Sequence, residues 1–128
     1  MSERFDERVV AEVAKSMILG VRAGGGSHRI TGVWAVVVEG RVFVRSWGIT
    51  PGGWFDTFVK ESRGTMQIGK REIKVRAIRT RSEGLKDAVE AAYAAKYPTK
   101  ASQKWVRGFR ERKRRDATIE LVPLTATR

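Results

Sequence analysis

The feature that most constrains the fold of this chain is a pair of β-type segments, residues 30–38 and 41–47, with only two residues between them. The first segment is β-branched and apolar on both faces, which is typical of a strand that is covered on each side. The second alternates apolar and polar side chains, and the intervening Glu39-Gly40 suits a two-residue turn. We therefore predict a β-hairpin in which Val38 pairs with Arg41.

This register decides which side chains share a face of the hairpin. Counting back from the turn places Val36 opposite Phe43, Trp34 opposite Arg45, and Gly32 opposite Trp47. A guanidinium over an indole ring forms a cation–π contact. We therefore expect such a contact between Arg45 and Trp34, with Gly32 leaving room for Trp47.

A second hairpin is predicted where residues 64–68 and 71–79 flank Gly69-Lys70. Residues 64–71 also match a P-loop pattern in all but the last position, where Arg71 replaces the hydroxyl residue that would hold magnesium. A P-loop must open a helix, whereas the residues after Lys70 alternate like a strand. Nucleotide hydrolysis is therefore disfavoured.

Apolar residues at helical spacing predict helices over residues 2–22 and 54–62, a longer helix that ends at Pro98, and a last helix capped by Ser102. Together with the hairpins, they predict one α+β domain over residues 1–128. Its parts are an N-terminal helix within 1–23, hairpins over 28–80, a helical segment over 82–115 and a final strand at 117–123.

The composition excludes several kinds of chemistry. The chain has no cysteine and one histidine, so a thiol nucleophile is excluded and a dedicated metal site is not expected. No apolar run reaches the roughly 20 residues that cross a bilayer, and no signal peptide is recognised, so we expect a soluble, cytoplasmic protein with no membrane span. The net charge of +12 indicates an anionic partner.

Positive charge is densest at residues 104–115, which hold seven basic residues and one acidic residue, a local net charge of +6. Such a run is either a solvated helical face or a binding patch. The second interpretation predicts a non-enzymatic nucleic-acid-binding module, since Trp105 and Phe109 interrupt the basic residues. Its contacts would be Arg107, Arg110, Lys113, Arg114 and Arg115. The same aromatic pair, four residues apart, also suits the buried side of a helix.

Several short motifs in order resemble an uncharacterised bacterial family, domain of unknown function 2255. They lie in the segments 28–48, 54–73, 91–97 and 117–123 and include the stretches 33–36, 42–48, 54–55 and 92–97. The strand pair followed by Gly48 and Trp54 also resembles the FMN/deazaflavin-binding split-barrel superfamily. This resemblance implies an antiparallel split β-barrel with flanking helices.

The wider resemblance also implies a function. Its members bind FMN or a deazaflavin, often as homodimers, and act as small oxidoreductases. By position, the phosphate of a phosphorylated small-molecule ligand would contact Arg29, Thr31, Arg45, Ser46 and Lys60, while Trp34, Trp47 and Trp54 would flank the ring.

Two alternatives stay open. The barrel could bind no flavin and take an acidic metabolite instead, and Trp34 and Trp47 could be core or interface residues with Arg45 as an ion-pair partner. No residue is identified as catalytic, and the sequence does not decide whether the chain is an enzyme.

Overall fold

The computed structural model describes residues 4–25, 29–48 and 51–124. Its elements, in chain order, are α1 Glu7–Lys15, β1 Leu19–Ala23, β2 Thr31–Val33, β3 Ala35–Val38, β4 Arg41–Arg45, α2 Trp54–Lys60, β5 Arg63–Ile68, β6 Arg71–Arg79, α3 Glu83–Lys96, the 3₁₀ turn η1 Lys100–Ser102, α4 Gln103–Gly108, α5 Arg112–Arg115 and β7 Thr118–Pro123.

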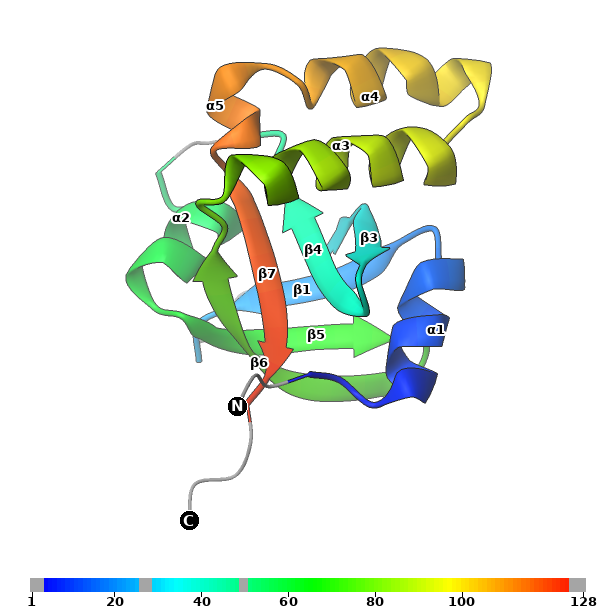
Figure 1. Cartoon of the computed structure of the whole chain (residues 1–128). Helices are drawn as coiled ribbons and strands as arrows, with labels where there is room; N and C mark the ends of the chain where they lie inside the picture. The colour runs from blue at the N-terminus through cyan, green and yellow to red at the C-terminus, as the bar shows by residue number, and fades with distance from the viewer. Residues whose placement is uncertain (1–3, 26–28, 49–50, 125–128) are drawn as a thin grey trace.

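The strands form one antiparallel sheet of seven strands in the order β2-β1-β5-β6-β7-β4-β3. Its two edge strands, β2 and β3, are consecutive in the chain and are separated only by Trp34. One bent segment therefore joins the two ends of the sheet and nearly closes it into a barrel (Figure 1). The predicted α+β, split-barrel-like fold is confirmed.

The predicted registers hold next to the turns. Val38 pairs with Arg41 and Val36 with Phe43 in the first hairpin, and Ile68 pairs with Arg71 in the second. The residues around Gly69 are thus a hairpin and not a P-loop.

Beyond Ala35 the predicted register is wrong. The β3–β4 ladder ends where Ala35 pairs with Val44, and Gly32 pairs with Gly20 of β1 instead of lying opposite Trp47. The predicted first strand is therefore two strands, each bound to a different neighbour. Among the described residues, no cation–π contact joins Arg45 and Trp34.

The N-terminal helix is shorter than predicted. It ends at Lys15, because Ser16 has extended backbone angles, and the next residues form β1 between β2 and β5. Val9 and Val13 of the helix are buried, whereas Met17, which would continue the same apolar stripe, lies beyond its end and is 52% exposed. The alternating burial of Leu19–Ala23 has the period of two that marks a strand. Residues 26–28, which include the single histidine, lie outside the described residues.

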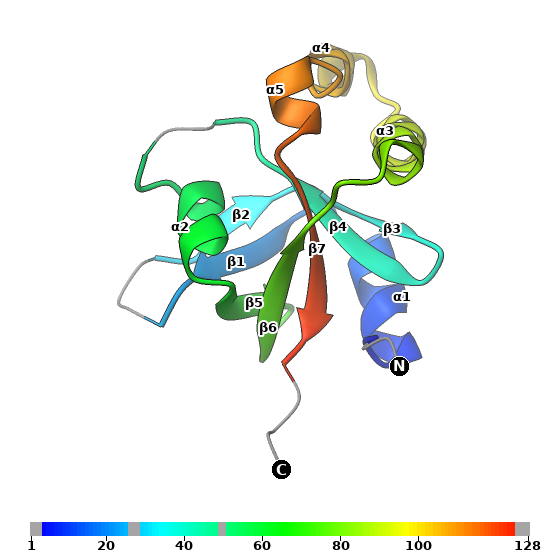
Figure 2. The same cartoon turned by 60° about the vertical axis from the view of Figure 1, so that its left-hand side comes forward.

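The helices cover different parts of the barrel. Helix α3 packs on β3 and α4 lies beside α3, so that α3, α4 and α5 form a layer across one end of the barrel (Figures 1 and 2). Helix α2 lies on another side, against β1 and β6. In the part of the chain that the structure describes, every helix is too short or too polar to cross a bilayer.

Candidate functional site

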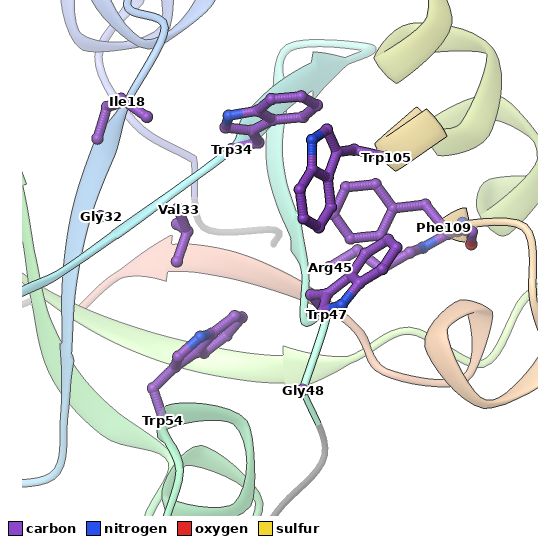
Figure 3. A pocket seen from close by; sticks show the side chains of 10 residues that line it. All are labelled: Ile18, Gly32, Val33, Trp34, Arg45, Trp47, Gly48, Trp54, Trp105 and Phe109. Carbon is purple, nitrogen blue, oxygen red and sulfur yellow. The ribbon is translucent and has the colours of Figure 1, made fainter. Parts of the chain in front are cut away.

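A cavity of about 370 Å³ opens between the barrel and the helical layer (Figure 3). We call it the tryptophan cavity, because its walls include all four tryptophans of the chain. Its lining residues are Ile18, Gly32, Val33, Trp34, Arg45, Trp47, Gly48, Trp54, Trp105 and Phe109. Figure 3 shows Trp34, Trp47 and Trp105 gathered near Phe109, while Trp54 lies across the cavity from them.

Trp34 is held at the bend between β2 and β3. Its indole stacks on Tyr97 of the α3 C-terminus, with ring centroids 4.0 Å apart and planes 4° apart. Its carbonyl accepts a hydrogen bond of 2.6 Å from the hydroxyl of Tyr93, which in turn accepts one from the backbone N–H of Arg45. Burial raises the pKa of Tyr93, so this hydroxyl stays protonated and can donate. One face of the Trp34 ring is therefore covered by the ring of Tyr97.

Trp47 follows β4 and lies against the α4–α5 segment. The guanidinium of Arg114 lies over its ring, and the Nε of Arg114 donates to its carbonyl at 3.0 Å. Its ring also meets the edges of Trp105 and Phe109, at centroid distances of 4.8 and 5.6 Å. These contacts fix an indole that is 36% exposed.

Arg45 is only 2% exposed and is held by acceptors within the protein. Its Nε donates to the Thr118 hydroxyl, its Nη1 to Glu90 and to the Phe109 carbonyl, and its Nη2 to the Lys86 carbonyl. Four of its five N–H groups are thus used. Burial lowers the pKa of Arg45, against the opposing effect of Glu90. The observed contacts are those of an ion-pair partner, and they leave only one N–H group of Arg45 for a further acceptor such as a phosphate.

The other residues proposed from the resemblance lie apart. Arg29 and Thr31 line a separate cavity of about 200 Å³, which shares the wall formed by Trp54. Ser46 is buried, and its hydroxyl donates to the Gly48 carbonyl. Lys60 is exposed and pairs with Asp56 at 3.1 Å. The structure thus brings Trp34, Arg45, Trp47 and Trp54 around one cavity, and leaves Ser46 and Lys60 outside it.

The sequence does not place Trp105 and Phe109 in the cofactor site. Their basic neighbours suggest a nucleic-acid surface, and their spacing of four suggests the buried side of a helix. Phe109 is buried, but Trp105 is 40% exposed, and both line the tryptophan cavity.

The basic run is not one helix. Helix α4 ends at Gly108 and α5 begins at Arg112. Arg115 is held by Glu83, Asp87 and Glu90 at 2.7, 2.8 and 2.7 Å, and these bonds raise its pKa. Arg107, Arg110 and Lys113 are exposed.

A second cavity of about 500 Å³ shares Trp47 and Trp105 with the tryptophan cavity. We call it the cationic groove. Beside those two tryptophans, it is lined by Lys104, Arg107, Gly108, Glu111 and Arg114. Within the described ranges, no cluster of three or more histidine or acidic side chains could hold a metal ion.

Comparisons with known proteins identify the family of the chain and proteins of similar fold. No protein with a curated description matches the chain. The conserved hypothetical protein Rv2991 from Mycobacterium tuberculosis has a similar fold, with a TM-score of 0.59 and 12% identity over 100% of this chain and 87% of that one. A heme binding protein from Mycobacterium smegmatis gives a TM-score of 0.51 and 12% identity over 94% of this chain and 52% of that one. Residues 8–121 match the family described as "Uncharacterized protein conserved in bacteria (DUF2255)", and the chain therefore belongs to this family.

Proposed function

We propose that this protein binds a flavin-type cofactor, FMN or a deazaflavin, with its ring in the tryptophan cavity. The observation that carries the proposal is the convergence of all four tryptophans, from four separate parts of the chain, on one cavity. Its volume of about 370 Å³ lies in the range of small-molecule sites. Flat aromatic walls favour a flat aromatic ligand, because offset and edge contacts between rings add to the burial of apolar area.

A second planar ligand can be weighed against the flavin. One structural neighbour is a heme binding protein. Heme iron in proteins is commonly held by histidine, cysteine, methionine or tyrosine. None of the ten residues that line the tryptophan cavity is of these types. A flavin needs no such ligand, and the lining therefore suits it better.

A bound flavin would supply the electron-transfer chemistry, so the proposed role is that of a small oxidoreductase. The chain's own residues would hold the ring between Trp54 and the cluster of Trp47 and Trp105, and would exclude water from it. No side chain is proposed as a catalytic acid or base. The homodimer implied by the family resemblance stays a prediction.

Tryptophan fluorescence tests the proposal directly, since every tryptophan lines the cavity. Titration with riboflavin, FMN or a deazaflavin should quench most of the intrinsic fluorescence in a saturable way and shift the visible bands of the bound flavin. N-acetyl-tryptophanamide at equal absorbance controls for light absorbed by the flavin. A linear response that matches this control for all three compounds would contradict the proposal, and heme in the same assay tests the rival ligand.

Single-stranded nucleic acid is the second candidate ligand. The observation that favours it is the exposure of Arg107, Arg110 and Lys113, none of which has a carboxylate partner among the described residues. The logarithm of the association constant for an oligonucleotide should then fall linearly with the logarithm of the salt concentration, with a slope of about −0.7 for each phosphate contacted. An Arg110→Gln, Lys113→Gln variant should reduce that slope. A salt-independent affinity would contradict this candidate.

A further inference from the structure

We propose that the cationic groove binds the phosphate of the cofactor whose ring occupies the tryptophan cavity. This inference rests on the proposed function and gives the phosphate a different place from the one implied by the family resemblance. The groove's three basic side chains, Lys104, Arg107 and Arg114, would hold the phosphate.

The first argument is continuity. Trp47 and Trp105 line both the tryptophan cavity and the cationic groove. A ligand whose ring contacts these two indoles therefore has the groove beside it. The flavin ribityl chain is flexible and carries the phosphate at its far end, so one molecule can reach from the cavity into the groove.

The second argument is unpaired charge. Within the described part of the chain, Lys104 and Arg107 have no carboxylate partner, and the Lys104 ammonium lies over the Trp105 ring, 5.1 Å from its centroid. Arg114 is fixed by the carbonyls of Trp47 and Gly108 and by Glu111 at 3.2 Å. The groove thus carries three positive charges against one negative charge, and a phosphate would be attracted to it.

The third argument is comparison with the cavity beside α2. That cavity is smaller, about 200 Å³ against about 500 Å³, and among the residues that the structure describes Arg29 is the one cationic side chain that lines it. Lys60, which the resemblance adds to this site, does not line it and pairs with Asp56. Among the described residues, Trp54 is the one that the cavity beside α2 shares with the tryptophan cavity. The groove therefore offers more charge and a wider connection to the ring.

Riboflavin and FMN together make the test, because they share one ring and differ in the phosphate. We expect the full-length protein to bind FMN about tenfold more tightly than riboflavin at low salt. A Lys104→Gln, Arg107→Gln variant should bind FMN about as weakly as riboflavin and should bind riboflavin as before. The matched control, Arg29→Gln, should leave both affinities unchanged.

The outcomes separate the two proposals. If riboflavin and FMN bind equally well to the unaltered protein, or if Arg29→Gln weakens FMN and the groove variant does not, the groove assignment is wrong and ring binding stands. If neither compound binds, both proposals fail. Because Lys104 and Arg107 are exposed, the variant should fold, and an unchanged thermal midpoint checks this. Arg107→Lys, which keeps the charge, should retain most of the preference for FMN.

Discussion

The guanidinium carbon of Arg114 lies 3.5 Å from the ring centroid of Trp47, in a cation–π contact that ties the α4–α5 segment to the end of β4. Gly108, the last residue of α4, lies against the same Trp47 ring. A Cβ atom at Gly108 would overlap the Trp47 ring, lying 2.5 Å from its Cζ3. The wall between the tryptophan cavity and the cationic groove therefore depends on a glycine that lets an indole approach the backbone.

The first prediction follows from this close approach. Gly108→Ala should push the Trp47 ring away and change the near-ultraviolet circular dichroism that the stacked aromatics produce. The loss of the ring contacts should cost about 0.5–1.5 kcal/mol, partly offset by the higher helix propensity of alanine. Gly84→Ala in α3 is the matched control, since its Cβ would meet only the Ser82 hydroxyl at 3.7 Å. An unchanged spectrum for Gly108→Ala would show that Trp47 is not held in this way.

The second prediction concerns the buried ion pair. Arg45→Met should lower the free energy of unfolding by about 3–5 kcal/mol, because it removes the donors of two buried carbonyls and the Thr118 hydroxyl and one partner of Glu90. Urea denaturation measures the change. The control is Arg71→Met, which breaks an exposed pair with Glu12 and should cost only about 0–1 kcal/mol. Equal losses from the two variants would mean that Arg45 does not organise the core.

The third prediction separates binding from stability. Trp105 is 40% exposed, and its ring lines the cavity. Trp105→Ala should therefore weaken flavin binding about fivefold, equivalent to the loss of about 1 kcal/mol of ring contact. The thermal midpoint should change by only a few degrees. Val59→Ala removes a comparably exposed apolar side chain outside the cavity and should leave binding unchanged. A retained affinity in Trp105→Ala would remove this indole from the proposed site.

The fourth prediction is a rise of stability with pH that depends on Lys96. Its ammonium donates to the carbonyls of Val13 and Ala35, at 2.9 and 2.6 Å, and none of the described carboxylates compensates for its loss of hydration. Burial therefore lowers the pKa of Lys96 from 10.5 to about 8. Between these two values the unfolded chain holds more protons than the folded one, so the free energy of unfolding should increase as pH rises through this window.

Lys96→Met provides the test. Urea denaturation from about pH 7.5 to about pH 9.5 should show the rise in the unaltered protein and a flatter profile in the variant. The range stops there because burial raises the pKa of Tyr97 to about 12, and an elevated tyrosine pKa makes stability fall with pH above the unfolded value of 10. Parallel profiles for the two proteins would show that Lys96 is not the source of the rise.

Next to their turns, both hairpin registers could be predicted, because the pairing there depends on interactions over a few residues. Glu39 and Gly40 have φ angles of 54° and 73°, and positive values at both central residues match the twist of the flanking strands. Once this turn forms, the period of two in the side chains fixes the pairing of Val36 with Phe43. In the second hairpin, the alternation of side chains on either side of Gly69-Lys70 also predicts the observed pairing of Ile68 with Arg71.

The errors came from residues whose partners are distant in sequence. Trp34 looks like the middle of a strand, but its ring stacks on Tyr97, and the chain on either side of it pairs with β1 and β4. For Arg45 the sequence left both a phosphate contact and an ion pair open, because its acceptors lie 41 to 73 positions away. A periodic pattern in the sequence does not show which distant residues will be these partners.

The sequence alone determined the turns, the alternation of the strands and the positive charge of the chain, because each depends on residue type and short-range spacing. Only the tertiary structure decided that β2 and β3 join the two ends of one sheet, that Arg45 is buried, and that four scattered tryptophans share a cavity. The physical reason is that closing a barrel brings together side chains according to strand order and packing. Strand order and packing depend on the free energy of the whole fold and not on any one segment.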